Sequence, residues 1–279
     1  MKKYRYSLFS LFVSLVVLAG CEDVVDVKLD QGQPQLVVDG VVSDQPGPYV
    51  VMLSKTAPYF ENVQTPRVMG AVVKITDNEG NAETLTEIEP GKYVTNTLRG
   101  KIGNHYVLEI QAEGETYRAE TDIKRVPEID SLKQSFKPKS TFWEEGYYVL
   151  YYGPEYPGPG DYYRFKIYKN DVLINQPLDL LVRSDAFVEG SYISGPEMNN
   201  KPFQVGDRIK IEVCSITEDN YYFYNEMFTQ INNGGLFANP PANVRTNVMN
   251  RNPGSVKKAV GYFEGMGVRS KQITIQEGK

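Results

Sequence analysis

The sequence predicts a mostly β protein with two β-rich regions, the second of which carries one amphipathic helix. Three observations support this. Short stretches of alternating apolar and polar residues recur from residue 35 onward, separated by Gly, Pro, Asn and Asp. The composition changes after Pro127, because eight tyrosines and the only tryptophan fall between residues 143 and 168. One stretch, 217–231, has apolar residues at helical spacing.

The first region, residues 34–127, is predicted to contain seven short strands. These are 36–42, 49–53, 72–76, 83–86, 91–95, 105–111 and 116–121. Their nearly regular spacing is typical of an immunoglobulin-like sandwich, here of the carboxypeptidase-regulatory-like kind. Asp77-Asn78-Glu79-Gly80 resembles part of a calcium loop, but the later bidentate glutamate is not in register. A hairpin turn is therefore favoured, and no metal ligands are assigned.

The second region, residues 128–279, is predicted to be a tyrosine-rich β domain. Val126-Pro127-Glu128 marks its start, because proline cannot donate to a strand ladder. The predicted strands are 147–152, 162–168, 208–214, 259–264 and 268–276. Aromatic residues pair across strands, so cross-strand packing accounts for most of the tyrosines.

The predicted helix of this region spans about residues 217–231. Ser215-Ile216-Thr217-Glu218 fits a capping box. An apolar stripe follows at Tyr221, Tyr224, Phe228 and Ile231. We expect this stripe to dock on a sheet rather than to hold a cofactor.

Trp143 and Tyr156 are the candidate contacts with a partner, because both lie outside the predicted strands. Tyr156 belongs to a loop, 153–160, that is too rich in Pro and Gly to form a regular element. Aromatic residues dominate binding hot spots, and proline limits the entropy lost on binding. The alternative is that Tyr156 folds back over the core of the second region.

The chain holds one histidine, His105, and two cysteines, Cys21 and Cys214. A triad or a histidine-based zinc site would need His105. That residue lies in an alternating strand without a partner motif, so a solvated strand histidine is expected. If Cys21 is acylated, Cys214 has no disulfide partner and is expected to be a small packed residue.

The N-terminus, residues 1–20, has the pattern of a lipoprotein signal peptide. A basic stretch precedes an apolar run that is too short to span a membrane. Leu18-Ala19-Gly20-Cys21 then forms a lipobox, with cleavage expected between Gly20 and Cys21 and lipid on Cys21. The alternatives are an ordinary signal peptide and an uncleaved membrane helix. An acidic tether, 21–33, would let the body stand off the membrane.

The charge of the chain disfavours nucleic acid as a partner. The formal net charge is −5, and removal of the three basic residues of the signal peptide would lower it to −8. Phosphate backbones require clustered Lys and Arg instead.

These features together resemble a known lipoprotein family. Besides the lipobox, the resemblance rests on Leu36-Val37-Val38-Asp39-Gly40-Val41-Val42, Gly70-Ala71-Val72-Val73-Lys74-Ile75-Thr76-Asp77, Val126-Pro127-Glu128-Ile129-Asp130-Ser131, Tyr162-Tyr163-Arg164-Phe165 and Val260-Gly261-Tyr262-Phe263. The chain resembles the Bacteroidetes lipoproteins grouped as domain of unknown function 4249. The resemblance covers essentially the mature chain and carries no catalytic residues.

The resemblance implies a non-enzymatic accessory or ligand-binding subunit of a TonB-dependent receptor uptake system. Members are typically encoded beside such outer-membrane barrels. Acidic residues after the lipidated cysteine, here Glu22-Asp23, favour the cell surface over the periplasmic face. The alternatives are a surface adhesin or assembly subunit and, less favoured, a glycan-active enzyme with paired carboxylates. No cofactor is expected.

Overall fold

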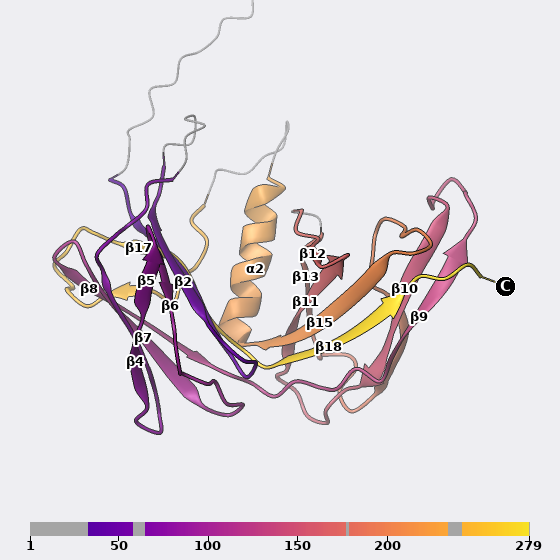
Figure 1. Cartoon of the computed structure of the whole chain (residues 1–279), viewed down its shortest axis with the longest axis horizontal. Coiled ribbons are helices and arrows are strands. Elements are labelled where there is room, and N and C mark those ends of the chain that lie inside the picture. The colour runs from indigo at the N-terminus through magenta and orange to yellow at the C-terminus, as the bar shows by residue number, and fades with distance from the viewer. Residues whose placement is uncertain (1–32, 58–64, 177–178, 234–241, 279) are drawn as a thin grey trace, which may run out of the picture. The chain divides into compact units, whose positions relative to one another are not determined.

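The structure is a computed structural model that describes residues 33–57, 65–176, 179–233 and 242–278. It is mostly β, with helix α2 (Glu218–Ile231) beside the strands of the second region (Figure 1). Residues 34–279 form one compact unit. The predicted fold class is therefore confirmed. The signal peptide and most of the tether lie outside the described residues.

The first region is a sandwich of two five-stranded sheets. One sheet has the order β17-β1-β2-β6-β5 and the other has the order β16-β8-β7-β3-β4. The strands from the first half of the chain are β1 (Leu36–Ser43), β2 (Val50–Lys55), β3 (Val72–Asp77), β4 (Ala82–Thr84), β5 (Thr86–Glu89), β6 (Lys92–Val94), β7 (His105–Ala112) and β8 (Glu115–Asp122). Alternating residues of these strands form the core; Val38, Leu53, Ile75 and Leu108 are fully buried.

Two strands of this sandwich come from the far end of the chain. Strand β16 (Met249–Asn250) pairs with β8, and β17 (Ala259–Met266) pairs in parallel with all of β1. The expected division, which places 259–264 in the second region, therefore requires correction. Parallel pairing needs a long crossover, so local spacing could not reveal it.

The second region contains two further sheets, with the orders β14-β10-β9 and β12-β11-β15-β18, and with β13 also pairing with β11. Their strands are β9 (Ser131–Lys137), β10 (Gly146–Pro154), β11 (Tyr162–Lys169), β12 (Val172–Leu173), β13 (Leu181–Ser184), β14 (Tyr192–Glu197), β15 (Arg208–Ile216) and β18 (Val268–Thr274). Val149 and Tyr151 of one sheet pack with Ile211 and Val213 of the other in a single apolar cluster.

Gly267 connects the two regions, because it alone separates β17 from β18. Its backbone exchanges hydrogen bonds with Ser215: Ser215 N–H donates to Gly267 O at 2.8 Å, and Gly267 N–H donates to Ser215 Oγ at 2.9 Å. A Cβ at position 267 would lie 2.7 Å from Lys124 O. The chain can therefore pass from one sheet to the other only with glycine here.

The N-cap of helix α2 lies two residues after Ser215, where the expected capping box would place it. Ser215 lies in β15, and the N-cap is Thr217, whose side chain accepts from Asn220 N–H at 3.2 Å. Tyr224 of the predicted stripe is buried, whereas Phe228 and Ile231 are partly exposed. The first half of the helix therefore docks on the sheet.

Candidate functional site

A cavity of about 280 Å³ opens between the two sheets of the second region. Its walls are mainly apolar and aromatic, and they include Tyr151, Phe165, Leu181, Ile193, Met198 and Val213. Glu155, Arg183, Ser184 and Glu197 add polar groups. A concave, mostly apolar space with a few convergent polar groups is typical of a ligand site.

Glu155 is the buried polar group of this cavity. Glu155 directly follows Pro154, the last residue of strand β10, and only 9% of it is exposed. Its Oε1 accepts from Tyr163 O–H at 2.6 Å and from Tyr156 N–H at 2.8 Å. Within the described part of the chain, both hydrogen bonds to the Glu155 carboxyl go to Oε1. Over the same residues, Oε2 accepts no hydrogen bond.

Burial raises the pKa of the Glu155 carboxyl above its usual range, and the neighbouring carboxylates Asp161 and Asp185 raise it further. The hydrogen bonds from Tyr163 and Tyr156 act in the opposite direction. The pKa of the Tyr163 hydroxyl is also raised, by burial and by its bond to Glu155. Perturbed groups in a cavity mark a candidate site.

Arg183 stands on the same wall as Tyr163. The two residues are directly opposite in the ladder of β11 and β13, so their side chains project to the same face. The guanidinium donates to Val182 O at 2.9 Å. Over residues 33–57, 65–176, 179–233 and 242–278, no carboxylate lies within 4.0 Å of it. Arg183 is therefore an exposed cation available at the cavity.

The loop after β10 is held against the crossover between the two regions. Arg125 forms a bidentate pair with buried Asp161, with Nε 3.0 Å from both carboxylate oxygens. Asp185 accepts from Asp161 N–H at 3.1 Å. The Arg125 guanidinium lies over the Tyr156 ring, 4.6 Å from the ring centroid. The Tyr156 hydroxyl donates to Val126 O at 3.3 Å.

The two candidate partner contacts therefore differ in their surroundings. Tyr156 is half-buried and has contacts within the chain, as the alternative interpretation expects. Trp143 is 49% exposed in the connection between β9 and β10, and its neighbour Phe142 is 83% exposed. Trp143, with its neighbour Phe142, therefore stays the candidate contact with a partner, whereas the contacts of Tyr156 are structural.

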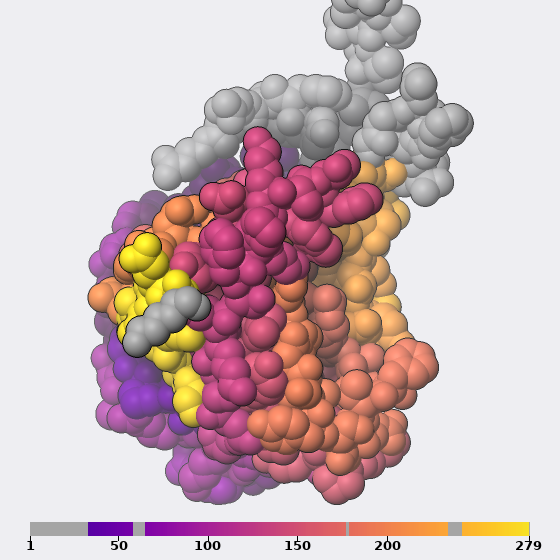
Figure 2. Space-filling model, turned by 90° about the vertical axis from the view of Figure 1, so that its right-hand side faces the viewer, coloured from indigo at the N-terminus to yellow at the C-terminus, as the bar shows by residue number. Residues whose placement is uncertain are grey.

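The outer face of β9 and β10 extends this surface, and these strands lie at the front of Figure 2. Lys137 Nζ lies 3.6 Å from the centroid of the Trp143 ring and 4.5 Å from that of Tyr148. Lys137 also pairs with Glu197 at 2.6 Å. Together Phe142, Trp143 and Lys137 form what we call the aromatic face; Tyr148, beside them, is buried. The cation–π contact with Lys137 holds one face of the Trp143 ring and leaves 49% of the residue exposed.

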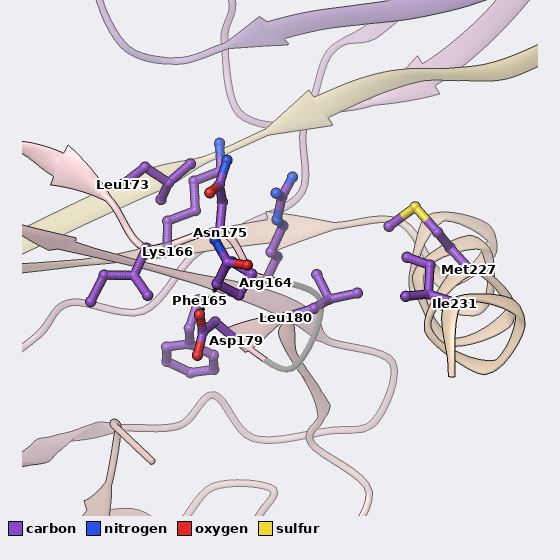
Figure 3. A pocket seen from close by; sticks show the side chains of 11 residues that line it. Arg164, Phe165, Lys166, Leu173, Asn175, Asp179, Leu180, Met227 and Ile231 are labelled. Atoms are coloured by element: carbon purple, nitrogen blue, oxygen red, sulfur yellow. Dashed lines mark hydrogen bonds between the residues drawn. The ribbon is translucent and has the colours of Figure 1, made fainter. Parts of the chain in front are cut away.

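A second, smaller hollow of about 160 Å³ lies between β11 and helix α2 (Figure 3). Met227 and Ile231 of the helix line one side, and Arg164 and Lys166 of β11 line the other. Arg164 is committed to the helix, because it donates to Tyr224 O–H. Lys166 contacts Met266 Sδ at 3.7 Å.

The remaining sequence candidates occupy ordinary structural positions. His105 lies in β7, with Nδ1 2.8 Å from Asp122 and Nε2 3.3 Å from Glu120. Asp77 accepts from the N–H groups of Glu79 and Asn81, as a hairpin turn requires. In the described ranges, no three His, Cys, Asp or Glu side chains converge as metal ligands.

Cys214 is fully buried, and burial raises the pKa of its thiol to about 11. It is the packed residue that the sequence predicts. Gly20 and Cys21 lie outside the described residues, so the lipobox stays a prediction. None of the helices that the structure describes is long and apolar enough to cross a membrane.

Sequence reasoning missed Glu155 and Arg183. The sequence places Glu155 in a loop rich in Pro and Gly, which predicts no buried position for it. Arg183 belongs to a short strand that no alternation marks. The one available signal was an acidic residue directly after a strand and before an aromatic residue, which is common in exposed loops too.

Comparison with known proteins adds the family. No curated protein matches the chain. The family model described as Domain of unknown function (DUF4249) matches residues 22–272, which include both β regions and helix α2. The chain therefore belongs to the DUF4249 family.

Proposed function

We propose that the chain is an outer-membrane lipoprotein that acts as a non-enzymatic, ligand-binding accessory of a TonB-dependent receptor. The lipobox supports the anchor, and the resemblance to Bacteroidetes lipoproteins supports the receptor as partner. The acidic start of the tether supports display on the cell surface.

The observation that carries the proposal is the aromatic face. Phe142 and Trp143 expose large apolar surface on one short connection. Aromatic residues of this kind are enriched at the centres of protein interfaces. Exposed apolar area is unfavourable in water unless a partner covers it. A receptor barrel in the same membrane is the partner proposed for this face.

The test is co-purification from detergent-solubilised outer membrane through a C-terminal tag. The wild type should retain a β-barrel receptor, and Trp143→Ala should lose most of it, because truncation of a hot-spot aromatic costs about 2 kcal/mol or more. Phe187→Ala is the matched control, since Phe187 is 99% exposed elsewhere on the second region.

Two further results complete this test. Cys21→Ala should release the protein from the membrane fraction and abolish labelling with radioactive palmitate. A wild-type preparation without any barrel, or equal losses from both aromatic variants, would contradict the proposal. Melting temperatures of the two aromatic variants should match that of the wild type.

A further inference from the structure

The cavity of the second region has three properties that restrict what can occupy it. It is small, it is apolar along most of its wall, and it presents a carboxyl group and a guanidinium. At about 30 Å³ per water, its volume of about 280 Å³ suits one molecule of roughly nine non-hydrogen atoms.

The apolar part of the cavity is preformed. The rings of Tyr151 and Phe165 meet edge to face, with centroids 5.9 Å apart, and so fix one wall. Leu181 is opposite Phe165 in the ladder of β11 and β13, and Ile193 projects from β14. Such a wall suits a branched aliphatic or aromatic side group.

The Glu155 carboxyl group can accept a hydrogen bond from a ligand, and a cationic donor fits it best. Glu155 lines the cavity; its Oε1 already has two donors, whereas Oε2 has none among the residues that the structure describes. Asp161 and Asp185 add negative charge close by, and Arg125 pairs with the former only. An ammonium group at Oε2 would compensate the buried carboxylate.

The guanidinium suits an anion. Arg183 shares its face with Tyr163, whose hydroxyl holds Glu155. Arg183 and Glu155 thus line the same cavity. Arginine binds carboxylates through two parallel N–H donors.

We infer that this cavity binds a small zwitterion of the α-amino-acid class with an apolar side group. The ammonium group bonds Glu155 Oε2, the carboxylate bonds Arg183, and the side group fills the space beside Tyr151 and Phe165. The inference deepens the proposed function by naming the ligand class, and it rests on the ligand-binding part of that proposal.

The test is calorimetric titration of the full lipidated protein in detergent with three probes of one carbon skeleton. L-leucine carries both charges, 3-methylbutylamine lacks the carboxylate, and 4-methylpentanoate lacks the amine. L-leucine should bind at least about tenfold more tightly than either half-ligand, because each charged hydrogen bond contributes on this scale.

Two variants then separate the charges. Glu155→Gln keeps the acceptor for Tyr163. It should weaken the binding of L-leucine and 3-methylbutylamine by about tenfold and leave the binding of 4-methylpentanoate unchanged. Arg183→Gln should weaken L-leucine and 4-methylpentanoate while sparing 3-methylbutylamine. Glu144→Gln and Arg251→Gln, on exposed sites away from the cavity, are the matched controls and should bind as the wild type does.

Several results would overturn the inference. These are no heat with L-leucine at millimolar concentration, equal affinities for all three probes, or unchanged binding in both cavity variants. If a variant fails to fold, the three probes on the wild type still decide. No receptor enters this measurement, so its failure leaves the receptor proposal standing, and loss of co-purification leaves the ligand result standing.

Discussion

The two β regions differ in what their interiors contain. In the first region, large side chains such as Tyr93, Tyr106 and Phe263 are almost fully buried and close the core. In the second region, a cavity opens between the two sheets beside their shared apolar cluster, and Glu155 lines it. Protein cores pack to crystal-like density and hold few voids larger than a water molecule. Under the proposed function, the first region is the scaffold and the second carries the binding surfaces.

The largest expected effect concerns the independence of the first region. Residues 34–127 alone should fail to fold, because β1 would lose β17 and Phe263 would leave the core. Circular dichroism should show no cooperative melt. Adding residues 245–267 through a flexible linker should restore one. A sharp transition for 34–127 alone would show that the first region does not depend on the far end of the chain.

Local patterns predicted most of the strands but not this dependence. The strands 105–111 and 116–121 form the hairpin β7–β8 because their alternation and turn are adjacent in sequence. The pairing of Val38 with Gly261 joins residues more than two hundred positions apart, and no local signal records it. Gly261 has φ +93°, and its Cβ would meet Val38 O. The sequence shows the glycine but not its partner.

The candidate site was predictable only in part, for a similar reason. Trp143 is exposed as expected of a residue between strands. Tyr156 is held by Arg125 and Val126, which belong to the crossover thirty residues earlier. The burial of Glu155 depends on Tyr163 and on the second sheet. Such contacts follow from how sheets stack, which periodicity alone does not contain.

The second prediction tests the junction where the regions meet. Glu264 of β17 is buried; Tyr224 of α2 donates to it, and Arg164 lies 3.8 Å from its Oε2. Arg164→Met should lower the free energy of unfolding at pH 7 by about 3–5 kcal/mol, because it leaves a buried carboxylate unpaired. Arg118→Met, at an exposed pair with Glu120, should cost less than about 1 kcal/mol. Urea unfolding measures both.

The pH dependence sharpens this test. Burial raises the pKa of Glu264 above its ordinary 4.5 in the folded state, although Arg164 opposes the shift. A raised folded pKa means stability that is present below about pH 4.5 and lost as pH rises. The unfolding free energy of Glu264→Gln should therefore increase relative to that of the wild type as pH rises from 4.5 toward 7. If the difference in unfolding free energy between Glu264→Gln and the wild type did not vary with pH, the pKa of Glu264 would not be raised by folding.

The smallest expected effect separates the structural aromatic residue from the binding one. Tyr156→Phe removes only the hydroxyl that donates to Val126 O at 3.3 Å, a long bond at a half-buried site. We expect a loss of about 0.5 kcal/mol in unfolding free energy, at the low end for a single hydrogen bond. Receptor co-purification should stay unchanged, because the Tyr156 ring faces Arg125 rather than solvent. Trp143→Ala should show the reverse pattern, with stability kept and receptor lost. If Tyr156→Phe instead weakened the receptor complex at unchanged stability, the partner would contact the loop after β10, and the aromatic face would not be the whole docking surface.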